Sequence, residues 1–538
     1  MRKNFWRLSG RGIGVALAAS WIALAAPQYA QAQVTAFKQA VAESAAREDG
    51  IAAFYRARNF EPIWTGAGAD HQARRAALIE ALDMAGAHGL PVGRYDDRVL
   101  MNQMRAARTA RDMGAVEVAL SRAFLQFAHD IQTGVLEPGR VIPAIKREVP
   151  KRPDDELLQA MADGDPRQVM RSLAPQSPEY TRLMRAKMMM EKQMQRGGWG
   201  ATVNASKLEP GQSGAAVVAL RDRLIAMGYL RATASAVYDD AMKAAVEAFQ
   251  ADNGLEVDGV AGSSTLKEIN VSLQQRLQSV LVAMERERWI NLPEGLGKRH
   301  IRVNLTDFTA KIIDDDKVTF ETRSVIGAGS YDRQTPEFSD VMEHMVINPS
   351  WYVPRSIIVK EYLPLLRRNP GAVGHLEITD SRGRRVNRGR GFSQYSASSF
   401  PFSMRQPPGP RNALGTVKFM FPNKYNIYLH DTPAKNLFSR EVRAYSHGCI
   451  RLNDPHDFAY ALLARQTADP KGFFQARLRS GAETKVDLEQ DVPVHLIYRT
   501  AFTTAKGQTN FRRDIYGRDA RIWQALRGAG VALTGQQS

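Results

Sequence analysis

The sequence predicts a multidomain chain: an α-helical N-terminal domain, a small three-helix domain, and a mostly β C-terminal domain with an inserted helical and loop segment. Apolar residues recur at helical spacing up to about residue 200 and again over residues 207–272. From residue 300 onward, short apolar runs alternate with polar residues, which is typical of strands. A chain of 538 residues has the length of roughly two to four domains.

The first 32 residues are typical of a secretory signal. Basic residues precede an apolar run over residues 13–26, and Ala30-Gln31-Ala32 offers a small-residue cleavage site. The run is short and rich in alanine for a membrane span, although an uncleaved anchor is the alternative. No later stretch approaches the ~20 apolar residues that a span requires. We therefore expect an exported protein with no transmembrane segment after signal cleavage.

Residues 33–200 are predicted to form the helical domain. Proline and glycine separate four periodic stretches, at residues 40–55, 72–88, 116–133 and 156–162. An aromatic loop at residues 60–64 is expected to pack into the core, and Gly197-Gly198-Trp199-Gly200 is interpreted as a linker. A further helical stretch begins at Leu273, and we expect residues 273–298 to pack back on this domain.

Residues 207–272 are predicted to form the small domain. One helix places its apolar residues on one face and stops at Gly228, a second repeats the pattern, and a short third begins near Ser263. The two apolar faces consist of Val217, Leu220, Leu224 and Met227, and of Met242, Ala245, Val246 and Phe249. Burying these faces against each other gives a compact unit.

The β domain is predicted over residues 300–500, followed by a tail with a short helix at 501–538. An insert at about residues 353–411 contains a helix and then a basic, glycine-rich run with five arginines between positions 382 and 390. Such a long insert is usually a lid or a binding element, and a solvated loop is the alternative.

The chain is basic, with a formal net charge of +17. A basic surface suits a polyanionic partner. Because export is expected, a cell-wall polymer or an anionic membrane surface is favoured over nucleic acid, and solubility alone would also account for the charge.

Cys449 is the only cysteine of the chain. A lone cysteine is most often a small buried apolar residue. Here it follows His447-Gly448, and His430 lies 19 positions earlier, at the end of a predicted strand. An exported chain with one cysteine forms no internal disulfide, and a free thiol outside the cytoplasm is easily oxidised. A catalytic role therefore explains the presence of Cys449 better than a structural role does. A thiol beside imidazoles predicts a nucleophile, because an imidazole can accept the thiol proton.

Metal and cofactor chemistry is not expected. One cysteine excludes cysteine-rich zinc sites, and the ten histidines show no H-E-x-x-H spacing.

The sequence of residues 208–266 closely resembles the peptidoglycan-binding domain of bacterial wall enzymes. The matching motifs are Leu208-x-Pro210-Gly211-x-x-Gly214, Leu224-x-x-x-Gly228-Tyr229, and Val246-x-x-Phe249-Gln250 followed by Gly254-Leu255, Asp258-Gly259, Gly262 and Thr265-Leu266. The resemblance implies a domain that holds an enzyme near its polymeric substrate and so raises the effective concentration.

The C-terminal domain resembles the L,D-transpeptidase (YkuD-like) catalytic domain. The signature is His430, fifteen intervening residues, and then Ser446-His447-Gly448-Cys449-Ile450-Arg451. Further matching blocks are Arg333-Gln334-Thr335-Pro336, Asn348-Pro349-x-Trp351-x-Val353-Pro354, Pro408-Gly409-Pro410-x-Asn412-Ala413-Leu414-Gly415, and His430-Asp431-Thr432-Pro433. These blocks are similar to the large Gram-negative branch of the family, which combines a helical scaffold domain, a peptidoglycan-binding domain and a catalytic domain with a capping insert. This branch implies a periplasmic enzyme.

The resemblance implies a role for each motif residue. Cys449 would be the nucleophile and His430 the general base, oriented by the backbone carbonyl of Asp431, with no part for that side chain. His447 is the rival base, but its place two residues before the nucleophile in a tight turn favours a supporting role. Backbone N–H groups around Gly448 would form the oxyanion hole. The expected substrate contacts, with a structural role as the alternative, are Tyr428, Ser446, Arg451 and Trp351.

The implied reaction joins two peptidoglycan stems. A tetrapeptide donor would acylate the cysteine with release of D-Ala, and the side-chain amine of a diamino-acid acceptor stem would then form a 3→3 cross-link. Wall synthases are conceivable partners, and carbapenems would acylate the same thiol. The alternatives keep the acyl-enzyme but pass it to water, a D-amino acid or a lipoprotein lysine, or replace catalysis by a wall-binding scaffold.

Overall fold

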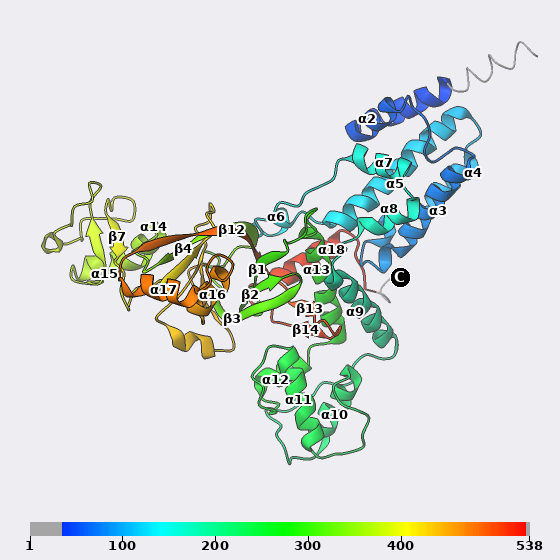
Figure 1. The fold of residues 1–538 in the computed structure, drawn as a ribbon. Coiled ribbons are helices and arrows are strands. Elements are labelled where there is room, and N and C mark those ends of the chain that lie inside the picture. Colours follow the sequence, from blue (N-terminus) through cyan, green and yellow to red (C-terminus); the bar gives the residue numbers. More distant parts are fainter. Residues whose placement is uncertain (1–34, 534–538) are drawn as a thin grey trace, which may run out of the picture. The chain divides into compact units, whose positions relative to one another are not determined.

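The computed structural model describes residues 35–533, which fall into two compact units (Figure 1). The first unit contains residues 35–135, 150–184 and 526–533, and the second contains residues 136–149 and 185–525. The signal expected over residues 1–32 lies outside the described residues. No helix within residues 35–533 is long and apolar enough to cross a bilayer.

The first unit is helical, as the periodicity predicts. Its elements are α2 (Asp49–Ala57), α3 (Ala69–Asp83), η1 (Met84–Gly86), η2 (Val92–Arg94), α4 (Asp97–Ala106), α5 (Ala110–Thr133), α7 (Asp154–Asp163), α8 (Pro166–Leu173) and the start of α9 (Pro178–Gln195). Helix α5 begins at a capping box, in which Thr109 and Asp112 satisfy each other's backbone N–H groups. The buried Glu117 of α5 accepts the backbone N–H groups of Ile63 and Trp64, and this anchors the aromatic loop in the core.

The small helical domain lies in the second unit. It consists of α10 (Ala215–Met227), α11 (Asp240–Asp252) and α12 (Ser263–Ile269) around one apolar core. Gly228 ends α10 with φ +86°, a left-handed conformation that glycine adopts without steric cost.

Two further helices of the second unit are joined by buried charges. Arg286 of α13 (Leu273–Trp289) lies 2.6 Å from Glu337 and 2.9 Å from Asp519 of α18 (Arg518–Gly528). Arg518 pairs with the same Glu337 at 2.8 Å. Helix α13, which we expected to accompany the N-terminal helices, therefore has its charged partners within the second unit.

The β domain is a nine-stranded sheet, with strand order β10-β3-β11-β9-β8-β4-β12-β1-β2 among the described residues. The strands are β1 (Arg299–Asn304), β2 (Thr309–Asp314), β3 (Lys317–Gly327), β4 (Phe338–Ile347), β8 (Val417–Met420), β9 (Leu429–His430), β10 (Ala444–Ser446), β11 (Ile450–Leu452) and β12 (Thr484–Ile497). Because β2 also pairs with β3, the sheet closes on itself. The mostly β prediction is confirmed.

The core of the sheet is apolar and is covered by α16 (Pro455–Leu463) and α17 (Pro470–Arg479). Phe458 of α16 packs on Phe419 of β8 and Phe320 of β3, with ring centroids 4.9 and 5.8 Å away. The remaining elements of this part are α6 (Pro138–Val141), η5 (Lys435–Ser439), β13 (Ala501–Thr503) and β14 (Thr509–Phe511).

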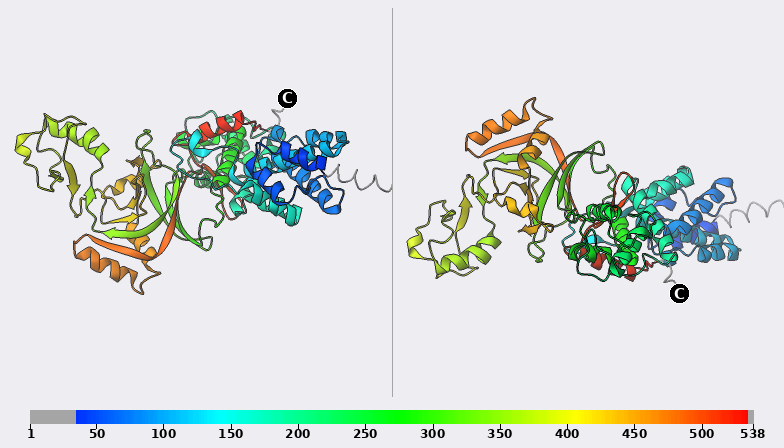
Figure 2. Two further views of the ribbon diagram at one scale, coloured as in Figure 1. Left: turned by 90° about the horizontal axis from the view of Figure 1, so that it is seen from above. Right: turned by 90° about the horizontal axis from the view of Figure 1, so that it is seen from below.

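The insert folds as a lobe with its own apolar core, coloured yellow-green in both views of Figure 2. It contains α14 (Arg355–Ile357), η3 (Ile358–Tyr362), α15 (Leu363–Arg368), η4 (Arg388–Arg390) and a sheet of β5 (Trp351–Tyr352), β7 (Ser403–Gln406) and β6 (Glu377–Thr379). Several of its arginines stabilise the lobe itself: Arg385 pairs with Glu377, and Arg388 donates to four backbone carbonyls. The segment is therefore an ordered lobe, and a solvated loop does not describe it.

Candidate active site

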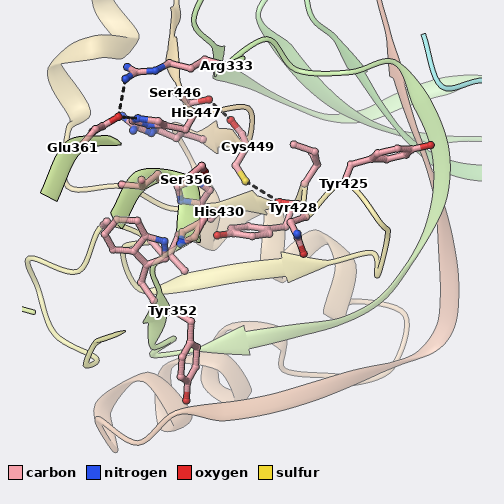
Figure 3. Close-up of a pocket in the computed structure, with 18 of the residues that line it drawn as sticks. Arg333, Tyr352, Ser356, Glu361, Tyr425, Tyr428, His430, Ser446, His447 and Cys449 are labelled. Atoms are coloured by element: carbon pink, nitrogen blue, oxygen red, sulfur yellow. Dashed lines mark hydrogen bonds and ion pairs between the residues drawn. The ribbon is translucent and has the colours of Figure 1, made fainter. Parts of the chain in front are cut away.

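The motif residues surround a cavity of about 630 Å³ in the β domain (Figure 3). Five segments line it: the turn at residues 446–451, the strand end at residues 425–430, the lobe residues 351–362, and the pairs 332–333 and 413–414. Every one of these segments lies in the second unit.

Strand register places the two candidate catalytic side chains on one face. Strands β9 and β11 run parallel, with Arg451 opposite His430 and Ile450 opposite Leu429. Side chains alternate along a strand, and paired residues point to the same face. Cys449 therefore shares a face with Tyr428, His430 and Arg451, and all four line the cavity.

The tautomer of His430 follows from its hydrogen bond. Its Nδ1 lies 2.5 Å from the carbonyl oxygen of Asp431. A carbonyl only accepts, so Nδ1–H donates and Nε2 of the neutral ring is left as the proton acceptor. Burial, reinforced by the positive charge of Arg451, lowers the pKa of His430 to about 3. The imidazole is therefore neutral at physiological pH.

The Cys449 thiol is protonated in this environment. Burial raises the pKa of Cys449 to about 11, although hydrogen bonds from Tyr428 and the charge of Arg451 oppose the rise. The thiol donates to the carbonyl oxygen of Asn426 at 3.4 Å, drawn as a dashed line in Figure 3. The resting site thus holds a neutral thiol and a neutral imidazole.

Tyr428 connects the two reactive groups. Its ring centroid lies 5.7 Å from that of His430. Burial, followed by the nearby Cys449, raises the pKa of Tyr428 well above its ordinary value, so the hydroxyl stays protonated. Trp351 is buried in the lobe beside Tyr362 and reaches the same cavity.

The turn before Cys449 is held by two hydroxyl groups. Ser446 donates to the Cys449 carbonyl at 2.5 Å and accepts the Gly448 N–H at 3.1 Å. Gly448 has φ +117°, which glycine tolerates best. Thr335 Oγ1 donates to the Gly448 carbonyl at 2.7 Å and accepts the Gly327 N–H at 2.9 Å. Ser446 is therefore engaged in the turn, and Thr335 fixes the peptide that joins Gly448 to Cys449.

The Asp431 side chain has a structural part that the sequence analysis missed. Its carboxylate accepts from the backbone and hydroxyl of Thr416 at 2.9 and 2.8 Å, from Thr432 N, and from Lys435 Nζ. Burial opposes ionisation, but Lys435 and Thr416 outweigh it and lower the pKa of Asp431. These bonds fix the residue whose carbonyl orients His430.

His447 points to a different partner. Its Nε2 lies 2.5 Å from Glu361 Oε1 of η3, and Arg333 donates to the same oxygen at 2.6 Å (Figure 3). Lys360 adds an ion pair to Asp332 at 2.9 Å. The lobe is thereby bonded to the motif turn and to residues 332–333. Spacing along the sequence carries no signal for Glu361, since 86 positions separate it from His447.

Arg451 lines the cavity and carries one nitrogen that is unpaired among the described residues. Its Nε is buried and has no hydrogen-bond partner within residues 35–533. Burial lowers the pKa of Arg451, while the neighbouring Cys449 opposes that shift. Across the same described range no cluster of three or more His, Cys, Asp or Glu side chains could hold a metal ion.

Together the fold and the cavity define a class: a multidomain chain whose closed β sheet presents a histidine and a cysteine to one cavity beside an inserted lobe. Comparison with known families makes the class specific. Residues 298–472 match the "L,D-transpeptidase catalytic domain", residues 213–269 the "Putative peptidoglycan binding domain", and residues 49–186 the "Scaffold domain". The chain thus contains a YkuD-type L,D-transpeptidase catalytic domain together with a peptidoglycan-binding domain.

A curated protein of Haemophilus influenzae, described as "Putative L,D-transpeptidase", is 31% identical over 264 residues. The match covers 48% of this chain and about half, 50%, of that relative.

Two crystal structures of L,D-transpeptidases are also similar, each 16% identical and aligned over 55% of this chain. The one from Xylanimonas cellulosilytica is covered to 98% with a TM-score of 0.18, and the one from Stackebrandtia nassauensis to 97% with a TM-score of 0.22.

Proposed function

We propose that this chain is a peptidoglycan L,D-transpeptidase that forms 3→3 cross-links through a thioester on Cys449. The observation that carries the proposal is the β9–β11 register, which turns Cys449 and His430 to one cavity, with the imidazole held in the tautomer that accepts a proton. The catalytic and peptidoglycan-binding domain matches support the substrate class.

In the acylation step, the thiol sulfur attacks the carbonyl carbon between the L-centre of a diamino acid and the terminal D-Ala. With His430 at a pKa of about 3 and Cys449 at about 11, a resting thiolate–imidazolium pair is disfavoured. The proton therefore passes to His430 Nε2 as the carbon–sulfur bond forms. The carbon–nitrogen bond then breaks, the imidazolium returns the proton to the leaving amine, and D-Ala departs.

The oxyanion is assigned to the backbone around Cys449. The Gly448 N–H is committed to Ser446, whereas the Cys449 N–H has no acceptor among the described residues. The peptide that carries this N–H is the one braced by Thr335. A fixed donor of this kind stabilises charge that develops in the transition state.

In the second step, the side-chain amine of an acceptor stem attacks the thioester, and a new amide replaces the carbon–sulfur bond. His430 takes the amine proton and the thiol is restored. The energy of the broken amide is kept in the thioester, so the cycle needs no nucleotide. Water, a D-amino acid or a lipoprotein lysine in place of the amine would give a shortened stem, an exchanged stem or an attached protein.

Substrate binding is assigned to the remaining lining groups. The guanidinium of Arg451, which lines the cavity, suits a donor carboxylate, and Tyr428 and Trp351 supply the walls. His447 acts in support, through Glu361 of the lobe. The peptidoglycan-binding domain keeps the catalytic domain near the polymer. Residues 1–32 direct the chain to the periplasm, where wall synthases would supply new strands.

The test is intact-mass measurement of the full chain after incubation with a carbapenem, and separately with a tetrapeptide stem. We expect an acyl adduct on Cys449 in both cases, D-Ala release with the stem, and 3→3 dimers when acceptor is present. A folded Cys449→Ser chain should gain no mass, and a His430→Gln chain should acylate at least about a hundredfold more slowly. An adduct on another residue, or none on a folded wild-type chain, would contradict the proposal.

A further inference from the structure

A second cavity adjoins the catalytic one within the second unit. It measures about 440 Å³ and is lined by residues 146–148, 338–340 and 422–425 and by Leu292. Tyr425 lines both cavities, and the next residue, Asn426, accepts the hydrogen bond of the Cys449 thiol. The Tyr425 ring points away from Cys449 (Figure 3). The two cavities therefore meet at a loop that touches the nucleophile.

Cations surround this shared ring. The ammonium groups of Lys146 and Lys424 lie 6.0 and 5.6 Å from the centre of the Tyr425 ring. Neither lysine makes an ion pair with any residue in the described range 35–533. Two like charges at one aromatic ring, neither of them paired with a carboxylate, repel each other and favour an anion in that place.

A third cation, Arg147, lines the same cavity. It donates to Ser339 Oγ at 2.7 Å and to the Leu496 carbonyl at 3.2 Å, which are both neutral acceptors. Burial lowers the pKa of Arg147 to about 10, so it stays charged at neutral pH. Two carboxylates, Glu148 and Asp340, also line the cavity, and the balance is three positive groups to two negative ones.

Backbone pairing holds this cationic segment in place. Lys146 N–H donates to the Glu337 carbonyl at 2.8 Å, and Glu337 N–H donates to the Ala144 carbonyl at 3.0 Å. Ile145 forms a parallel bridge with Glu337, whose side chain is buried in the ion pairs with Arg286 and Arg518. A segment far upstream in the sequence thus becomes a fixed wall beside the catalytic cavity.

We propose that this second cavity binds the acceptor stem peptide, and that Lys146 and Lys424 bind its carboxylates. The inference rests on the proposed function, since it names where the second substrate lies. A donor esterified to Cys449 fills the catalytic cavity. A peptide held on the far side of Tyr425 can extend its side-chain amine past Asn426 to the thioester while its carboxylates stay on the lysines. Ammonium–carboxylate bonds of this kind are charge-assisted.

The experiment compares the full-length Lys146→Ala/Lys424→Ala chain with wild type and with a charge-matched control, Lys317→Ala/Lys471→Ala, whose lysines line neither cavity. Two rates are measured: D-Ala release in the first turnover with donor tetrapeptide alone, which reports acylation before the thioester is resolved, and 3→3 dimer formation at an acceptor concentration below its KM. We expect D-Ala release to stay within about twofold and dimer formation to fall about tenfold through a higher acceptor KM. The control should match wild type in both.

A modified acceptor sharpens the result. An acceptor stem with carboxamides in place of carboxylates should lose about the same tenfold on wild type and nothing further on the double variant. Equal dimer formation by the variant and wild type, or a parallel fall in D-Ala release, would overturn the inference.

Binding separates this inference from the proposed function. Anisotropy of a labelled stem peptide on the Cys449→Ser chain, with and without saturating unlabelled donor bound non-covalently, needs no turnover. Removing the two lysines should weaken this binding about tenfold and flatten its dependence on salt. Unchanged binding overturns the subsite even if wild type proves catalytically inert, and an inert wild type that binds through these lysines overturns only the proposed reaction.

Discussion

Replacing Thr335 by valine would remove one hydroxyl from beneath the catalytic turn with almost no change in shape. The hydroxyl is fully buried, donates to the Gly448 carbonyl at 2.7 Å and accepts from Gly327 N at 2.9 Å. Valine leaves both backbone groups buried and unpaired, at a cost of about 1–3 kcal/mol for each group. Part of this cost lowers the stability of the fold. The rest frees the Gly448–Cys449 peptide to rotate away from the developing oxyanion.

If the transition state loses half to all of the roughly 3 kcal/mol that one such hydrogen bond contributes at most, the acylation rate falls about tenfold to a hundredfold, since about 1.4 kcal/mol corresponds to a factor of ten. The assay is stopped-flow acylation by a carbapenem. Circular dichroism gives the melting temperature of each variant, and the rates are measured below it, where the variant is folded. Thr335→Ser keeps the hydroxyl and should acylate within about threefold of wild type. A folded valine variant that acylates at the wild-type rate, or a serine variant as slow as valine, would refute the reasoning.

Three other predictions concern protons and the lobe. Because the pKa of Cys449 is raised to about 11, alkylation of Cys449 by iodoacetamide should rise close to tenfold per pH unit from pH 7 to 10; a plateau near pH 8 would contradict this. The pKa of His430, about 3, lies below the ~6.5 of an unfolded histidine, so the unfolded chain binds more protons between these values and stability falls on acidification, by up to about 1.4 kcal/mol per unit. In urea unfolding at pH 7, 6, 5 and 4, the free energy of unfolding of His430→Gln should therefore change less with pH than that of the wild type. Glu361→Ala removes the partner of His447 at a partly exposed position. It should raise the donor KM about threefold with little change in Tm. An unchanged KM would show that the contact between His447 and Glu361 does not contribute to donor binding.

The sequence was sufficient for the fold class, and it singled out Cys449 and His430, which the structure places at one cavity. Strand alternation and helical periodicity are local signals, and the lone Cys449 beside His447 and downstream of His430 is visible in one dimension. The lobe was foreseen as an insert but not as a folded body, because its core joins residues such as Trp351 and Met404 that only come together through β5–β7 pairing.

The supporting groups could not be found in this way. Thr335 and Gly448 are 113 positions apart and meet because β3 lies between β10 and β11 in the closed sheet. The Asp431 carboxylate binds Thr416 across the β8–β9 hairpin, and Lys146 reaches the catalytic domain by one bridge to Glu337. Each contact depends on register or on closure, which periodicity in a single sequence does not encode.

The place of β12 in the sheet dictates when the β domain can close. This strand, Thr484–Ile497, lies between β1 and β4, although β1 is complete by residue 304. A chain made from its N-terminus onward consequently has an open barrel until more than nine-tenths of it is present, and the partner of Arg286 at position 519 comes later still. The paired arrangement of His430 and Cys449 therefore depends on a strand that comes late in the chain, and a fragment ending at residue 472 would lack the strand that closes the barrel.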